Sequence, residues 1–486
     1  MVRRRVREAD AEGRLFGEAT DLVAESLADG AALVWQGWEQ ALARTPAPGA
    51  DARRSPPAAH AILPRMPTPI SSSPDATPAG SDLIYDWNEI ARRGRIIDRG
   101  VTFFDETLRD GLQNPSVRDP SIEPKLKLLH LMNDLGIHGA DIGLPGSSKR
   151  AFDDVLRMCR EIVDHKLKVV PACAGRTMVG DVTPMIEIAQ QSGIPVEVYT
   201  FIGSSAIRQL VEDWSVELLC KRAAEAIDVA VKAGLPVAFV TEDTSRSRPE
   251  VLATLFKVAI DHGATRLCVC DTAGHATPDG VRNLIGFTRS IIAGMGASDT
   301  VKIDWHGHND RGLGLVNAIY ALECGAHRVH ATALGIGERV GNAPMELLLL
   351  NLKLLGLLDG QDLTKLIEYC TTAAEAVGWD IAINYPLVGR DAFRTATGVH
   401  ASAIIKAEQK GDAWLADRIY SGVPAGMFGR LQEIVVGFMS GASNVSYVLR
   451  KMGVEPSKEH VDAVLAAAKV SDHILSDDEI RAAIGV

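Results

Sequence analysis

From residue 95 onward the chain alternates short apolar, β-rich runs with stretches of helical periodicity, and this alternation constrains the fold more than any other feature. The strand candidates are Gly100–Phe104, His138–Leu144, Leu167–Cys173, Val196–Ile202, Pro236–Thr241, Arg266–Cys270, Val301–Trp305 and Arg328–Leu334. They recur at close to the roughly 30 residues of a βα unit, and their number, roughly eight, is that of a TIM barrel. The pattern predicts an α/β fold, the TIM (β/α)8 barrel, with a doubly wound open sheet as the alternative.

Polar residues follow each strand candidate at its carboxyl end. The first candidate runs into Asp105–Gln113, the fifth into Glu242–Arg246, and the seventh into His306 and His308. A closed barrel brings the carboxyl ends of all its strands onto one rim, where they face a shared pocket. The repeated polar ends therefore favour the barrel over the open sheet and predict an active site at that rim.

The pair His306 and His308 carries a chemical signal of its own. Residues two apart in a strand point to the same face, so the two imidazoles lie side by side. Adjacent imidazoles form half of a divalent-metal site, although such a pair can also line a solvated loop. Beyond the helical stretch Leu313–Cys324, with Gly325 as its C-cap, a further strand runs into Gly335–Asn342. That segment, GIGERVGN, holds charged and amide side chains between its glycines, which a tight turn alone does not need.

The composition narrows the class of partner. The formal net charge of −11 disfavours nucleic acid, although a local basic pocket can still bind an anionic substrate. No apolar run approaches the roughly 20 residues of a membrane span, so we expect no membrane association. The seven cysteines lack zinc-type spacing, which indicates reduced core thiols in a cytoplasmic protein.

The chain is expected to have three parts. Residues 1–92 form an extension, with helical periodicity over Leu15–Leu42 and a Pro-, Ala- and Ser-rich linker over Pro46–Gly80, and we expect it to be dispensable. Residues 93–365 form the catalytic barrel. Residues 366–486 form a mainly helical appendage. Its helix candidates are Ile367–Val377, Val445–Met452 and Lys458–Val470.

Several ordered segments resemble the metal-dependent, acyl-CoA-condensing family of isopropylmalate, homocitrate and citramalate synthases, which belongs to a superfamily of HMG-CoA-lyase-like barrels. In the barrel these are FFDETLRDGLQ (103–113), VTEDTSR (240–246), DTAGHATP (271–278), HGHNDRGLG (306–314) and GIGERVGN (335–342). In the appendage they are PLVGRDAFRTATGVH (386–400), IYSGVP (419–424) and GFMSGASNV (437–445). The resemblance covers residues 95–455 and implies an acyltransferase that joins acetyl-CoA to a 2-oxo acid.

The resemblance implies a metal centre. Asp110, His306 and His308 are expected to bind a divalent cation, Mg, Mn or Zn, with Asn342 as a fourth polar residue beside it. Such an ion polarises the ketone of the 2-oxo acid. Arg109, which cannot lose its proton, is expected to stabilise the developing enolate or alkoxide.

The resemblance also implies a proton relay and a homodimer. Glu338, His400 and Tyr420 are expected to remove a proton from the methyl group of acetyl-CoA. His400 and Tyr420 lie in the appendage, which in this family covers the barrel of the partner subunit. We therefore expect a homodimer with composite active sites.

Five rim residues are expected to bind substrate, and some depart from the family pattern. They are Gln113, Asp141, Arg208, Glu242 and Thr272. The family usually has Glu at the position of Asp141, His at that of Arg208, and often Thr at that of Glu106. Arg208 either turns to solvent or pairs with Asp141, which leaves a pocket for 2-oxoisovalerate, or binds a second carboxylate or a phosphonate of the substrate. The overall resemblance favours the 2-isopropylmalate synthase reaction, with homocitrate or citramalate synthesis as the alternative.

Two other classes remain as alternatives. Hydroxymethylglutaryl-CoA lyases share the barrel but carry a cysteine in the loop after the eighth strand, where this chain has GIGERVGN. A non-catalytic barrel has no need of Asp110, His306 and His308 together. The chain ends about where the appendage ends, so we expect no leucine-sensing domain.

Overall fold

The computed structural model of the protein describes residues 83–84 and 101–486. The expected N-terminal helix and linker, and the first residue of the first strand candidate, lie outside the described residues. The described chain divides into two compact units, one with residues 101–115 and 137–344, the other with residues 83–84, 116–136 and 345–486. The domain division expected from the sequence, at residue 365, stays a prediction.

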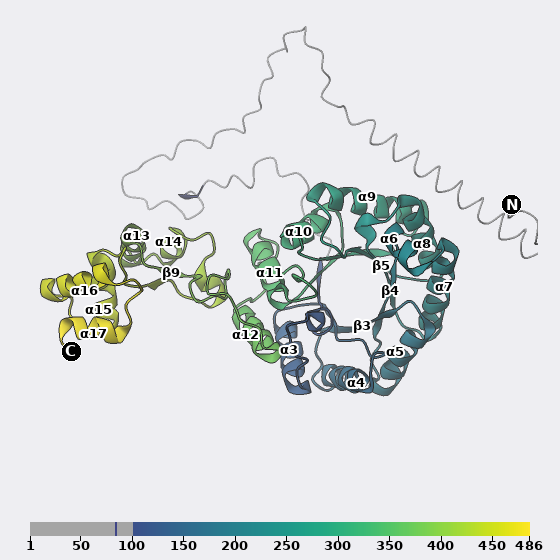
Figure 1. Ribbon diagram of the computed structural model, residues 1–486, viewed down its shortest axis with the longest axis horizontal. Helices are drawn as coiled ribbons and strands as arrows, with labels where there is room; N and C mark the ends of the chain where they lie inside the picture. Colours follow the sequence, from purple (N-terminus) through teal and green to yellow (C-terminus); the bar gives the residue numbers. More distant parts are fainter. Residues whose placement is uncertain (1–82, 85–100) are drawn as a thin grey trace, which may run out of the picture. The chain divides into compact units, whose positions relative to one another are not determined.

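The first unit holds a closed barrel of parallel strands in which each strand pairs with its neighbours in sequence and β8 pairs with β1 (Figure 1). The strands are β1 Thr102–Asp105, β2 Gly139–Asp141, β3 Val170–Arg176, β4 Glu197–Gly203, β5 Val237–Glu242, β6 Arg266–Asp271, β7 Lys302–Gly307 and β8 Arg328–Ala331. Each overlaps one strand candidate. The predicted TIM barrel is therefore confirmed.

Some predicted strand ends were wrong, and the backbone explains why. β2 ends at Asp141 because its side chain accepts a hydrogen bond from the Gly143 amide, and Gly143 has a φ of 145°. β8 ends at Ala331 and cannot extend to the predicted end at Leu334, because Leu334 has a φ of 57° and lies in a left-handed turn. In β3 and β4 the pairing extends beyond the predicted ends, to Arg176 and Gly203. The last residues of these strands thus approach the rim.

Helices of the first unit surround the barrel strands in Figure 1. They are α4 Lys149–Asp164, α5 Val179–Ser192, α6 Ala206–Glu212, α7 Val216–Lys232, α8 Pro249–Asp261, α9 Pro278–Gly294 and α10 Gly314–Cys324. The side chains of Ser148, Ser215 and Thr277 cap α4, α7 and α9 by accepting a backbone N–H. The predicted C-cap Gly325 ends α10 with a φ of 108°. The three N-caps fix the points at which loops on the rim side enter α4, α7 and α9.

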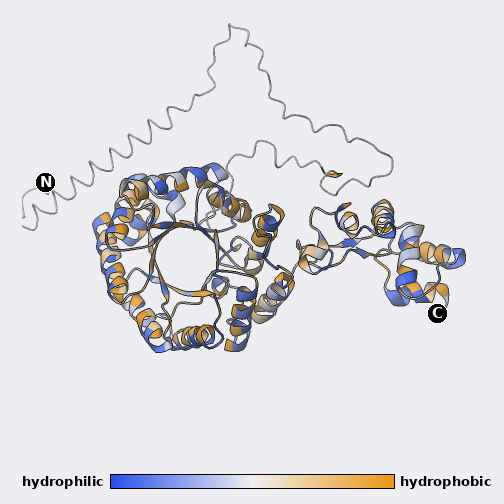
Figure 2. Ribbon diagram, turned by 180° about the vertical axis from the view of Figure 1, so that it is seen from behind, coloured by the Kyte–Doolittle hydropathy of each residue, from blue (hydrophilic) through white to orange (hydrophobic). Residues whose placement is uncertain are grey.

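The second unit is mainly helical. Its elements are α3 Ile122–Asp134, α11 Met345–Leu354, α12 Leu366–Val377, α13 Gly398–Gln409, α14 Ala413–Arg418, α15 Ala442–Lys451, α16 Lys458–Val470, α17 Asp477–Ile484, and the paired short strands β9 Arg394–Thr395 and β10 Glu433–Ile434. The three helix candidates of the appendage are found as α12, α15 and α16. Val445, Leu449 and Val464 form part of its core. Figure 2 shows that the helices of this unit carry both hydrophobic and hydrophilic residues. Among the described residues, no helix is both long and apolar enough to cross a membrane.

Candidate metal centre and active site

Three side chains from two parts of the rim converge on one point. His306 lies in β7 and His308 just beyond its end, and their Nε2 atoms are 3.1 Å apart. Asp110 follows β1, and its Oδ2 lies 3.6 Å from Nε2 of His306 and 3.8 Å from Nε2 of His308. All three residues are buried. The sequence predicted this grouping, and one ion placed among these atoms could contact all three.

The protonation states suit a cation. Burial and the neighbouring His306 lower the pKa of His308 to about 4, so His308 is neutral at ordinary pH and presents a lone pair. Burial tends to raise the pKa of Asp110, but Arg109 and the two histidines bring it below its ordinary value, so Asp110 is an anion. One carboxylate and two imidazoles form a ligand set that first-row divalent metals accept.

Asn342 and Gly337 provide further support for a metal-binding site at this point. The β8–α11 loop folds back so that Asn342 forms a backbone bridge with His308. Asn342 is 2% exposed, and neither polar atom of its side chain has a hydrogen-bond partner in the described chain. A Cβ at Gly337 would lie 2.5 Å from Asn342 Nδ2 and 3.0 Å from Asp110 Oδ1. A side chain at position 337 would therefore crowd two of the expected ligand residues, and the residues present fit a metal.

Arg109 lies among three carboxylates beside this centre. Its nitrogens are 2.8 Å from Glu106 Oε1, 3.0 Å from Asp110 Oδ2 and 2.8 Å from Asp141 Oδ2. Asp141, at the end of β2, is fully buried, and burial raises its pKa to about 7 although Arg109 opposes the shift. The guanidinium is therefore fixed in orientation, with its charge next to the metal ligands.

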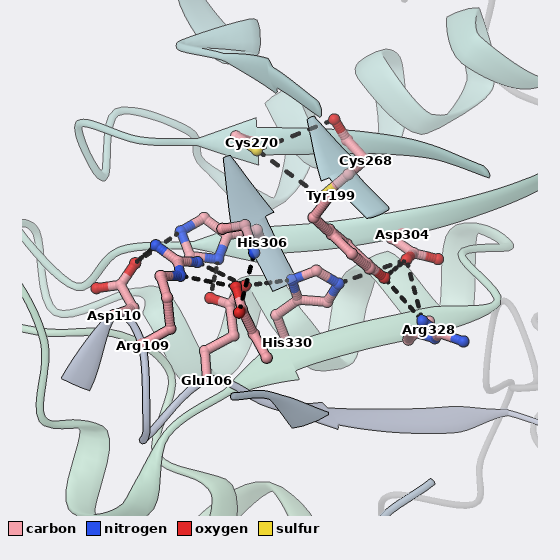
Figure 3. Close-up of polar contacts among 12 residues, drawn as sticks. Glu106, Arg109, Asp110, Tyr199, Cys268, Cys270, Asp304, His306, Arg328 and His330 are labelled. Atoms are coloured by element: carbon pink, nitrogen blue, oxygen red, sulfur yellow. Dashed lines mark hydrogen bonds and ion pairs between the residues drawn. The ribbon is translucent and has the colours of Figure 1, made fainter. Parts of the chain in front are cut away.

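Glu106 and His330 also belong to the centre, and they are missing from the sequence-predicted site (Figure 3). Glu106 Oε2 lies 2.7 Å from His306 Nδ1, and Glu106 Oε1 lies 3.0 Å from His330 Nδ1. Burial tends to raise the pKa of Glu106, but Arg109 and the two histidines hold it well below the usual range. The signal that could have found His330 is the period-two pattern of β8, which places it on the inward face together with Arg328.

The expected substrate residues lie around the rim in different settings. Glu242 ends β5 and is half-buried, and burial raises its pKa. Arg208 lies in α6 and pairs with Glu242 and Glu212, not with Asp141. The Thr272 hydroxyl accepts a hydrogen bond from the Asp243 amide, and Gln113 is exposed at the end of the short helix η2 Gly111–Gln113.

The expected relay residues fall in both units. The Glu338 amide donates to Asp110 Oδ1 at 3.4 Å, and its half-exposed carboxylate pairs with Arg339. His400, in the first turn of α13, and Tyr420 lie in the second unit with ring centroids 4.1 Å apart. Both side chains are exposed. Their roles stay predictions.

The fold and the site define a class, a parallel (β/α)8 barrel with a possible metal centre at its carboxyl rim. Residues 100–372 match the family described as HMGL-like. The homocitrate synthase AksA of Methanopyrus kandleri is 31% identical over 383 residues, 78% of this chain and 89% of the relative. The 2-isopropylmalate synthase of Methanocaldococcus jannaschii is 30% identical over 385 residues, 78% and 69% of the two chains. A protein of Methanosphaerula palustris provisionally named (R)-citramalate synthase CimA is 31% identical over 387 residues, 79% and 72%. The chain belongs to the HMGL-like family, and the resemblance seen in its motifs is confirmed.

Proposed function

We propose that the protein is an acyltransferase that condenses acetyl-CoA with a 2-oxo acid and hydrolyses the thioester. The observation that carries this proposal is the convergence of Asp110, His306 and His308 at the rim, directly beside Arg109. The relatives named above, which span most of this chain, are synthases of homocitrate, 2-isopropylmalate and citramalate.

The residues have distinct tasks in such a reaction. A bound divalent cation, Mg, Mn or Zn, would polarise the ketone of the 2-oxo acid. Asp110, His306, His308 and Asn342 would hold it. The methyl group of acetyl-CoA loses a proton, and its carbon forms a bond to the ketone carbon while the ketone oxygen gains the negative charge. Arg109 is permanently charged and fixed by three carboxylates, so it can stabilise that oxygen without reorganising. Water then cleaves the thioester, which releases CoA.

The proposed base is a relay of Glu338, His400 and Tyr420. The near-neutral pKa of an ordinary histidine suits proton transfer. His400 and Tyr420 are in mutual ring contact and exposed on the second unit, which supports a role towards another surface. We propose that they complete the active site of the partner in a homodimer.

For the 2-oxo acid, we propose an apolar, branched side chain. Leu144, Phe201 and Val240 are half-buried against the inward-facing core that contains Tyr199 and Ala238. Phe201 and Val240 lie two residues further toward the rim on the same strand faces, so they support an apolar wall on the inner face of the rim. This favours 2-oxoisovalerate, and hence a cytoplasmic role in leucine biosynthesis, over the substrates of homocitrate or citramalate synthesis.

The test is release of the CoA thiol, followed with a thiol reagent, when acetyl-CoA is supplied with 2-oxoisovalerate, pyruvate, 2-oxoglutarate or oxaloacetate. A synthase releases thiol only with both substrates. A lyase instead cleaves hydroxymethylglutaryl-CoA and releases no thiol in this assay. Of the seven free cysteines, none lies in the β8–α11 loop, which favours the synthase. Absence of thiol release with every acid would contradict the proposed function.

A further inference from the structure

The carboxylate of Glu106 lies at the centre of the buried polar contacts drawn in Figure 3. In the proposed reaction this carboxylate serves only as one of the three that fix Arg109. Its Oε2 contacts Nδ1 of His306 at 2.7 Å, and its Oε1 contacts Arg109 at 2.8 Å and Nδ1 of His330 at 3.0 Å. Glu106 is 2% exposed. Protein groups, and not bulk water, therefore satisfy both carboxylate oxygens.

This contact decides which nitrogen of His306 carries a proton. An ionised carboxylate only accepts hydrogen bonds, so Nδ1 of His306 is the donor. In a neutral imidazole the other nitrogen, Nε2, then has a free lone pair. Nε2 is the atom that faces His308 and Asp110. The hydrogen bond to Glu106 thus sets both the tautomer and the rotation of the ring that metal ligation needs.

His308, the second imidazole of the proposed metal centre, differs from His306 in the contacts of its Nδ1 atom. Nδ1 of His308 is buried without a hydrogen-bond partner in the part of the chain that the structure describes. Its ring is therefore not oriented by a carboxylate. Of the two imidazoles at the centre, only His306 has this support among the described residues.

Glu106 is itself held in place by a chain of buried side chains inside the barrel, which begins with His330. His330 extends from Glu106 to Asp304, whose Oδ2 lies 3.5 Å from His330 Nε2. Asp304 accepts a hydrogen bond from the Tyr199 hydroxyl at 2.6 Å and another from Arg266 at 2.5 Å. The chain from His306 through Glu106 and His330 to Asp304 is thus anchored on β4, β6, β7 and β8.

Folding stability alone does not explain why these charged and polar side chains are buried inside the barrel. TIM-barrel interiors are usually filled by layers of bulky branched residues. Buried charges lose hydration, and replacing such pairs by apolar side chains often leaves stability unchanged or raises it. Asp304 and His330 are nevertheless almost completely buried in the barrel. Their contacts favour a role in positioning.

We propose that Glu106 is a positioning residue that holds His306 in its metal-binding tautomer and orientation, and that His330 and Asp304 hold Glu106 in place. The inference rests on the proposed metal centre. The proposed hydrogen bonds leave no place for a second ion between Glu106, His306 and His330, although the ligand atoms of these residues are also close together. Distances of 2.7 and 3.0 Å there are those of hydrogen bonds, and a second ion would need the lone pair that the Nδ1 proton occupies.

Titration calorimetry with Mn²⁺ tests this proposal on the full chain. Glu106→Gln keeps the shape of the side chain but removes its charge, and we expect Mn²⁺ affinity to fall by roughly 10–100-fold. Asp304→Asn should give a smaller loss. The matched control is Glu197→Gln, which removes another buried barrel carboxylate, paired with Arg266 and Arg328 but not with a metal ligand. It should lower the Tm yet change Mn²⁺ affinity less than about threefold.

The outcomes separate this inference from the proposed function. If the wild type binds one Mn²⁺ per chain and Glu106→Gln binds it equally well, the positioning role is wrong. Two ions per chain also contradict it. If the wild type binds no divalent ion, both the metal centre and the proposed function fail.

A measurement on the wild type covers the case in which Glu106→Gln does not fold. Selective ¹⁵N-histidine labelling of the Zn²⁺-loaded protein reports the tautomer of each ring, and a His306→Asn spectrum assigns the signal. The proposal requires a proton on Nδ1 of His306. A proton on Nε2, or on neither nitrogen, would overturn it.

Discussion

Nε of Arg208 lies 3.2 Å from Oε1 of Glu242, and its Nη1 lies 3.0 Å from Oε1 of Glu212. Arg208 reaches this position by packing over Gly203 at the end of β4, where a Cβ would lie 2.9 Å from the same Nε. One positive charge therefore faces two carboxylates. A second carboxylate on a substrate would meet a group with net negative charge, which disfavours a dianionic 2-oxo acid.

This arrangement predicts the order of substrates. We expect kcat/KM to be higher for 2-oxoisovalerate than for 2-oxoglutarate or oxaloacetate. Glu212→Gln removes one of the two carboxylates that pair with Arg208. The kcat/KM for 2-oxoglutarate relative to that for 2-oxoisovalerate should therefore rise by roughly 2–5-fold, a small change because a half-exposed ion pair contributes little energy. The control is Glu225→Gln, which breaks an ion pair with Lys221 on α7 and should leave the ratio of the kcat/KM values unchanged. A wild-type preference for dianionic acids that Arg208→Ala abolishes would show that Arg208 binds substrate.

The converging ligands predict a metal requirement. Chelation should abolish CoA release, and Mg, Mn or Zn should restore it. His306→Ala removes one of the two imidazole ligands and should lower kcat/KM by at least about 100-fold, because metal binding and orientation are both lost. The control is His275→Ala, an exposed histidine in the β6–α9 loop. Full activity of the metal-free enzyme, or of His306→Ala, would refute the metal centre.

The close approach at Gly337 predicts an effect of a single methyl group. Gly337→Ala places a Cβ 2.5 Å from Asn342 Nδ2, so Asn342 or the loop must move. We expect unfolding free energy to fall by about 1–3 kcal/mol and metal affinity to fall with it. Gly180→Ala, in the first turn of α5 with nothing within 4 Å of the new Cβ, is the control. Unchanged metal affinity in Gly337→Ala would show that the loop yields freely.

The barrel and the pair His306 and His308 could be predicted from local periodicity, whereas Asp110 and Asn342 were assigned to the metal through the family resemblance. A two-residue step at a strand end was enough to pair His306 with His308. The partners of Glu106 could not be found this way. Its contact with His330 depends on the pairing of β1 with β8, the first and last strands of the barrel, which only the closed sheet brings together. The pairing of Arg208 with Asp141, one of the alternatives expected from the sequence, is wrong for a related reason, since Arg208 lies on the short helix α6, whose direction no periodic pattern sets.

Buried Asp141 predicts a pH-dependent difference in stability. Burial raises its pKa to about 7, above the roughly 3.9 of an unfolded aspartate. Between these pH values the folded chain keeps a proton that the unfolded chain releases, so the Asp141 contribution to stability is lost as pH rises from about 4 to 7. Asp141→Asn lacks this proton equilibrium. Urea unfolding of metal-free protein should therefore show the variant gaining stability relative to wild type across this range, and a constant difference would refute the raised pKa.

The exposed pair His400 and Tyr420 predicts complementation between inactive subunits. If these residues act in the active site of the partner, Asp110→Ala and His400→Ala chains each spoil a different part of a composite site. A mixed dimer then contains one site built from intact parts, so mixing the two inactive proteins should restore CoA release to roughly a quarter of the wild-type rate when subunits pair at random. Exchange is verified by mass spectrometry of differently labelled chains. Asp110→Ala mixed with the double variant Asp110→Ala/His400→Ala is the control, since no pairing of these chains has an intact barrel site. Proven exchange without recovery would place His400 in the site of its own subunit or outside catalysis.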